Sequence, residues 1–134
     1  MQTKPFLTRD DAARILDAAR TEAAANGWAV AIAVVDDGGH PLALERLDGC
    51  AAIGAYIGLE KARTAALGRR DSQAYEDMIN GGRNAFLCVP QLNGMLTGGV
   101  PILVDGHVVG AVGVSGVKPD QDAQVARAGV AAAA

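Results

Sequence analysis

The stretch that decides the fold is VPILVDGHVVGAVGVS, residues 100–115. Two runs rich in β-branched residues, 100–104 and 107–115, flank the pair Asp105-Gly106, which favours a type I′ turn between antiparallel strands. The stretch therefore predicts a hairpin in which Val104 pairs with His107 and Ile102 with Val109. The face that this register creates carries mostly small side chains: His107, Val109, Ala111, Gly113 and Ser115.

A second hairpin is predicted nearer the N-terminus. Residues 28–36 alternate between bulky Val30, Ile32 and Val34 on one face and three alanines on the other. The turn sequence DDGG, residues 36–39, follows, and residues 41–47 are expected to fold back as the partner strand. The first strand of this hairpin therefore has one bulky face and one nearly flat face.

Helical periodicity marks three longer segments. The first covers residues 9–25, at whose start Thr8 and Asp11 imitate a capping box. The second covers residues 120–130 and starts directly after Pro119. Residues 52–68 form the third helix. Residues 72–79 are predicted as a short helix, and residues 92–96 as a middle strand of the sheet.

The helix predicted at 52–68 is apolar on two sides. Its alanine-rich face suits close packing on the flat strand face, and the opposite stripe surrounds Glu60. A partner subunit or a ligand is expected to cover that second stripe. The alanine-rich face comprises Ala51, Ala55, Leu59, Ala62 and Ala66; the second stripe comprises Ile53, Tyr56, Ile57, Thr64 and Leu67.

Length and composition indicate one globular domain over residues 1–134. The chain has a mass of 13.6 kDa, 50% hydrophobic residues and a mean hydropathy of +0.17, which excludes a disordered chain. Its apolar residues are small: 27 alanines and 17 glycines stand against one tryptophan, two tyrosines and two phenylalanines. Helices and sheet must therefore approach closely to build a core.

Charge and hydropathy argue against two classes of partner. A net charge of -3 and a pI near 5.2 give no field that attracts nucleic acid. The longest apolar run, residues 28–35, is far shorter than the roughly 20 residues that cross a membrane. Residues 1–8 carry no secretory signal, and the two cysteines lack metal-type spacing, so a cytoplasmic location is expected.

Charged residues in apolar surroundings are the first candidates for chemistry. Arg46 and Asp48 follow a strand, Glu60 and Lys61 lie on a helix, and Asp122 opens the last helix. One interpretation is structural ion pairing. The other is a small pocket in which Arg46 or Lys61 binds an anion and the glycines at 98 and 99 let the backbone approach it.

The two histidines are the second candidates. His40 and His107 each follow a hairpin turn, where solvated side chains are common. Either is also suited to bind haem iron or to act as a base. Asp36, Asp37 and His40 on one turn form a further candidate, a metal-binding cluster.

Several motifs, taken together and in this order, resemble the GlcG/HbpS-like family, also called the haem-degrading domain family. They are VVD at 34–36 with Gly39, RLDG at 46–49, KA at 61–62 with TA at 64–65, GGVPI at 98–102, and GAVGVSG at 110–116 followed by QD at 121–122. The resemblance implies an α+β fold, a profilin-like α/β/α sandwich with a five-stranded antiparallel sheet flanked by helices. It also implies homo-oligomers and, for some members, haem.

Two hypotheses for function follow. The first is a cytoplasmic small-ligand or haem-binding accessory protein linked to a catabolic pathway, with His40 as the ligand of the haem iron. Its expected binding residues are Arg46, Asp48, Thr64, Gly98, Gly99, Pro101, Ser115 and Asp122, beside Lys61.

The second hypothesis is an enzyme, an isomerase, tautomerase or lyase, that abstracts a proton from a small organic acid. Glu60 or His40 is then the base, and Lys61 or Arg46 stabilises the carboxylate or the developing enolate. A third interpretation gives Glu60 only a structural salt bridge between subunits.

Overall fold

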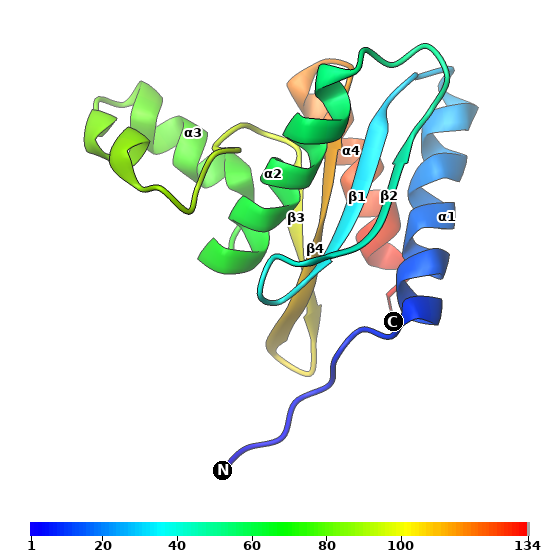
Figure 1. The fold of residues 1–134 in the computed structure, drawn as a ribbon, viewed down its shortest axis with the longest axis horizontal. Coiled ribbons are helices and arrows are strands. Elements are labelled where there is room, and N and C mark those ends of the chain that lie inside the picture. The colour runs from blue at the N-terminus through cyan, green and yellow to red at the C-terminus, as the bar shows by residue number, and fades with distance from the viewer. Residues whose placement is uncertain (134) are drawn as a thin grey trace.

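Helices pack on both faces of one antiparallel sheet in the computed structural model, which describes residues 1–133 (Figure 1). In the described part of the chain, no helix is long and apolar enough to cross a membrane. The helices are α1 (Arg9–Ala25), α2 (Ile53–Gly68), α3 (Ser72–Asn80), the short 3-10 helix η1 (Asn84–Cys88) and α4 (Pro119–Ala131); the strands are β1 (Ala31–Asp36), β2 (Pro41–Arg46), β3 (Gly99–Val104) and β4 (His107–Ser115).

Within residues 1–133 the sheet has four strands in the order β2-β1-β4-β3, and all neighbours are antiparallel. The prediction of a fifth strand at 92–96 is wrong. The side chains of α3 hold that region: Ser72 Oγ donates to the Leu96 carbonyl, and the Glu76 carboxylate accepts the Thr97 N–H at 3.0 Å. Because side chains satisfy these backbone groups, the segment leads into β3 without pairing itself.

The turn between β3 and β4 confirms the predicted hairpin. Asp105 and Gly106 have φ of 51° and 79°, both in the left-handed region that a type I′ turn requires. Val104 pairs with His107, as expected.

A β-bulge then shifts the register of this hairpin. Ile102 pairs with Gly110, so the predicted pairing of Ile102 with Val109 is wrong. Val109 is the extra residue of β4 and joins the core on the side of α1 and α4, whereas Ala111 belongs to the core beneath α2. Val109 and Ala111 therefore do not lie on one face, although the sequence predicts that they do. A bulge commonly re-aims a side chain in this way.

The two faces of the sheet are covered differently. The bulky face packs on α1 and α4, where Ile15, Val30, Ile32, Val112 and Val114 are fully buried. The flat face packs on α2 (Figure 1). The predicted division of β1 into a bulky and a flat face is confirmed.

Glycines bring α2 closest to the sheet. A Cβ added to Gly113 would lie 2.1 Å from the carbonyl oxygen of Gly58, so the helix backbone rests directly on β4. The packing face of α2 comprises Gly54, Gly58, Ala62 and Ala65, whereas Ala51 is exposed and Ala55 and Leu59 are only partly buried. Ala66 is also buried on this face, so the predicted alanine face is correct at Ala62 and Ala66, and the prediction missed the glycines because hydropathy gives glycine no weight.

Both hairpin turns lie at the same end of the sheet (Figure 1). The register explains this, since Asp36 at the end of β1 pairs with Gly110 near the start of β4. His40 and His107 therefore belong to one end of the molecule, although 67 positions separate them in the sequence.

Candidate functional site

Lys61 and Asp122 form a buried ion pair that joins α2 to the first turn of α4. Lys61 Nζ donates to Asp122 Oδ2 at 2.9 Å and to the Val114 carbonyl at 3.0 Å, and both side chains are about 95% buried. Asp122 Oδ1 accepts the Val117 N–H at 3.1 Å. Burial raises the pKa of the Asp122 carboxyl, and the hydrogen bond and charge of Lys61 oppose that shift.

The glycines at 98 and 99 make room for Lys61. A Cβ on Gly98 would lie 2.9 Å from Lys61 Nζ, and a Cβ on Gly99 would lie 2.1 Å from the Lys61 carbonyl oxygen. The sequence predicts that these glycines let the backbone approach a ligand; in the structure it is Lys61 itself that occupies the space beside them.

Three further predicted binding residues lie buried around this pair. Ser115 and Pro101 are buried in β4 and β3, and Thr64 is fully buried in α2. Within residues 1–133 the Thr64 hydroxyl has no hydrogen-bond partner. Six of the eight predicted binding residues, Thr64, Gly98, Gly99, Pro101, Ser115 and Asp122, are thus buried, whereas Arg46 and Asp48 are exposed.

Glu60 faces away from its neighbour Lys61. Its Oε1 accepts from Arg63 Nη1 at 2.9 Å, while Oε2 is buried and has no partner in the part of the chain that the structure describes. The Glu60–Arg63 ion pair lies within α2. The carboxylate of Glu60 and the ammonium group of Lys61 therefore have different partners and do not form one site.

His40 stands on the turn between β1 and β2 with its imidazole 78% exposed. Asp36 Oδ1 accepts hydrogen bonds from the backbone N–H groups of Gly38 and His40, at 2.9 Å each. The same carboxylate lies 3.1 Å from His40 Nδ1. Asp36 thereby fixes the ring through Nδ1 and leaves Nε2 directed to solvent.

The predicted metal cluster on this turn is wrong. Asp37 pairs with Lys4 instead, and that bond lowers the pKa of the Asp37 carboxyl. Among residues 1–133 no group of three histidine, cysteine or acidic side chains is placed to hold a metal ion.

An apolar groove of about 440 Å³ runs between β2 and α2. Arg46 is the charged residue in its lining, and Asp48 is exposed beyond the end of β2. No local sequence pattern marks this groove, because its walls come from separate elements. Its lining comprises Leu44, Arg46, Ala52, Ala55, Tyr56 and Leu59.

The groove is next to the His40 turn along α2. Leu59 in the groove is one helical turn from Arg63, and the Cγ of Arg63 lies 3.4 Å from the position of a Cβ on Gly39. Arg63 was missed as a candidate. Its spacing of three residues from Glu60 was the available signal, although such a pair is also common on exposed helices.

Comparison with known proteins places these features in a family. A family model described as "Haem degrading protein HbpS-like" matches residues 7–131. Protein GlcG of Escherichia coli is 57% identical over 115 residues, which cover 86% of this chain and 85% of that protein.

Solved structures agree with this match. A mutant of HbpS from Streptomyces reticuli superposes with a TM-score of 0.89 at 30% identity, over 98% of this chain and 89% of the other. The protein ORFY of Klebsiella pneumoniae gives a TM-score of 0.91 at 27% identity, over 99% of this chain and 94% of the other.

Proposed function

Because the chain belongs to the HbpS-like family of haem-degrading proteins, we propose that it is a haem-binding accessory protein in which His40 ligates the iron. The observation that carries the proposal is the contact between Asp36 and His40 Nδ1. A carboxylate on one ring nitrogen sets the tautomer and strengthens the other nitrogen as a metal ligand. In this chain that other nitrogen, Nε2, belongs to a side chain that is mostly exposed.

The surroundings of His40 suit the rest of a haem molecule. The macrocycle is apolar, and the groove lined by Leu44, Tyr56 and Leu59 offers an apolar surface on the adjoining part of α2. Arg46 in the groove would pair with a propionate group, since Arg63 beside the turn is already paired with Glu60. Bound haem would supply the redox chemistry of its iron, while these residues ligate and orient it.

The chain offers a matched control for this proposal, because it has only two histidines. Haem titrated into the haem-free protein should give a Soret band that survives gel filtration. The His40→Ala variant should lose or shift that band, and His107→Ala should keep its wavelength, because the position of the band reports the iron ligand. A band that is unchanged in His40→Ala would assign the iron to another ligand.

A second variant tests the role of Asp36 through a partial loss of haem affinity. Asp36→Asn keeps an oxygen that accepts from the turn backbone but removes the charge beside Nδ1. The turn should persist while haem affinity falls by roughly 10-fold to 100-fold, as for other partners of metal-ligating histidines. Equal haem affinity in Asp36→Asn and the parent would remove Asp36 from the site.

Acid–base catalysis on a small organic acid is a second candidate function, and the Asp36–His40 pair also favours it. A carboxylate-oriented imidazole is a common general base. Glu60 remains the alternative base through its unpartnered Oε2. Proton exchange of short carboxylic acids in D₂O, followed by NMR, should be lost in His40→Ala or Glu60→Gln; exchange that survives in both variants would reject both bases.

The proposal includes a cytoplasmic homo-oligomer, with a second copy of the chain on the exposed side of α2. Ile53 and Tyr56 are 60% and 73% exposed there. Thr64 was predicted to share this stripe, but it is buried against the sheet side. The stripe is therefore limited to Ile53, Tyr56, Ile57 and Leu67, and it adjoins the apolar groove.

A further inference from the structure

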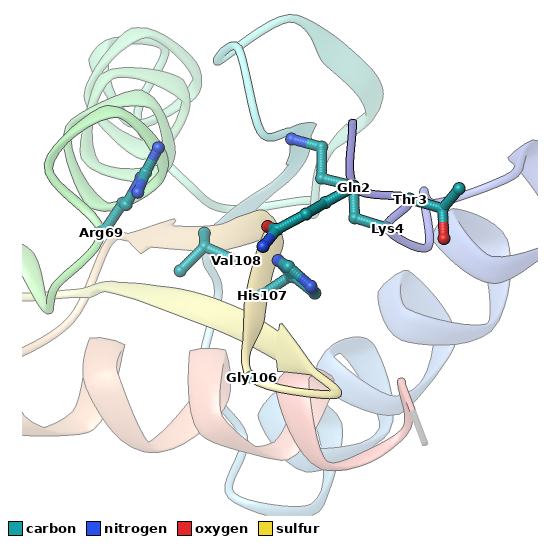
Figure 2. Close-up of a pocket in the computed structure, with 7 residues that line it drawn as sticks. All are labelled: Gln2, Thr3, Lys4, Arg69, Gly106, His107 and Val108. Carbon is teal, nitrogen blue, oxygen red and sulfur yellow. The ribbon is translucent and has the colours of Figure 1, made fainter.

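A second pocket lies at the hairpin end of the sheet, apart from the apolar groove. It has a volume of about 410 Å³, is open to solvent on one side and is bounded by the N-terminal segment, the end of α2 and the β3–β4 hairpin (Figure 2). Gln2, Lys4, Arg69, His107 and Val108 all contribute to its lining. Four of these five side chains carry hydrogen-bond donors, and none of them is acidic.

The charges of this pocket do not cancel. Lys4 pairs with Asp37, so that cation is already compensated. Within residues 1–133, neither Arg69 nor His107 has an ion-pair partner. One guanidinium therefore remains uncompensated in a pocket that an imidazole and a primary amide also line, in a chain whose net charge is -3.

Arg69 also occupies an unusual backbone position. It caps the C-terminus of α2 with φ 55° and ψ 38°, and its N–H donates to the Ala65 carbonyl. This left-handed position is usually glycine, because a Cβ is disfavoured there. Arginine at this position costs stability, and it directs a guanidinium to the pocket wall.

We propose that this pocket binds the carboxylate of a small organic acid. A guanidinium binds a carboxylate through two parallel hydrogen bonds, and the His107 ring and Gln2 amide supply further donors. One uncompensated cation matches a single negative charge better than a doubly charged phosphate. The volume is within the range of small-molecule sites and leaves room for an acid of a few carbons.

Titration of the haem-free protein with propionate, followed by NMR, tests the proposal. The parent should show saturable shifts of the pocket residues, and Arg69→Gly and His107→Gln should each weaken binding by roughly tenfold or more. Arg70→Gln is the matched control, because Arg70 stacks on Tyr75 outside the pocket and should leave binding unchanged. Inorganic phosphate is titrated for comparison.

Arg69→Gly separates binding from folding. Glycine relieves the left-handed backbone at this position, so the variant should unfold at the same or a higher temperature than the parent. Loss of propionate binding in a variant that is at least as stable supports the site. Equal binding of propionate by the parent and both pocket variants, or binding of phosphate alone, would overturn it.

The carboxylate can come from a free acid or from the propionate arm of a porphyrin. Haem and its dimethyl ester distinguish these sources: if Arg69→Gly weakens haem but not the ester, the porphyrin supplies the carboxylate. If it weakens propionate alone, a free acid does. If neither propionate nor haem responds to Arg69→Gly, the pocket has no carboxylate role, whatever the outcome at His40.

Discussion

At the scale of single residues, Lys61 and Asp122 hold the two helical layers together through buried charges. Each charge has lost its water, and each is compensated by the other and by one backbone group, the Val114 carbonyl or the Val117 N–H. The pair itself need not stabilise the fold relative to two apolar residues. Removal of one partner is costly, because the other charge then stays buried alone.

Lys61→Met should therefore lower the free energy of unfolding by about 3–5 kcal/mol, measured by chemical denaturation at neutral pH. The double variant Lys61→Met with Asp122→Leu should recover most of that loss. Arg127→Gln serves as the control, because the Arg127–Asp71 pair is exposed and its loss should cost less than about 1 kcal/mol. If Lys61→Met lowered the free energy of unfolding as little as Arg127→Gln, the structural role of the pair would be refuted.

The stability that Lys61→Met loses is also expected to depend on pH. The pKa of Asp122 is raised, so the folded state binds this proton more tightly than the unfolded chain. The associated stability is fully present below the ordinary carboxyl pKa and is lost as pH rises through the raised value. The deficit of Lys61→Met should shrink as pH falls, since protonation removes the unpaired buried charge.

At the scale of elements, the contact between α2 and β4 depends on glycines that touch backbone to backbone. Gly113→Ala should lower the free energy of unfolding by about 1–3 kcal/mol or more, because its Cβ would meet the Gly58 carbonyl at 2.1 Å and the Ala62 nitrogen at 2.4 Å. Thermal or chemical unfolding of the purified variant measures this cost.

Gly58→Ala is the matched control on the helix side of the same contact. Its Cβ would lie 3.3 Å from the Ala31 carbonyl oxygen, a contact that a small shift relieves. Alanine also favours the helix by up to about 1 kcal/mol. The effect of Gly58→Ala should therefore be small, and an equally large loss in both variants would mean that the contact tolerates neither side chain.

The elements that were predictable from sequence carry local signals. The capping box of Thr8 and Asp11 forms as expected, and the helix it begins ends at Ala25 as predicted. Asp105 and Gly106 define their turn because two adjacent residues there need positive φ. The bulge in the β3–β4 hairpin is not evident from the sequence pattern, and the segment at 92–96 is predicted wrongly, because side chains of α3 bond the backbone where this segment leads into β3.

The candidate site likewise combines features that the sequence indicates with features that only the fold creates. Structural ion pairing is one of two interpretations that the sequence offers for its charged residues in apolar surroundings, and Lys61 and Asp122 do form such a pair; their pairing with each other is not evident from the sequence. The location of His40 and His107 at one end of the sheet is not evident from the sequence, since it follows from the pairing of β1 with β4. The Arg69 pocket likewise joins segments that no local pattern connects.

At the scale of the whole molecule, the apolar surface is unevenly distributed. The accessible surface is 7032 Å², slightly above the about 6,600 Å² expected of a folded monomer of this mass. Part of the surplus is apolar: Ile53, Tyr56 and Leu44 are 60%, 73% and 46% exposed on α2 and the adjoining edge strand β2. Exposed contiguous patches of this kind mark interaction sites in monomeric folds.

Tyr56→Glu should convert an oligomer into a monomer, because the charge would have to be desolvated in the interface. Size-exclusion chromatography with light scattering measures the change in mass, and circular dichroism checks that the fold persists. Leu103→Glu is the control: Leu103 is 60% exposed on β3, at the opposite edge of the sheet, and its substitution should leave the assembly intact. If Leu103→Glu dissociates the protein and Tyr56→Glu does not, the interface lies on β3 and the α2 stripe is free for a ligand.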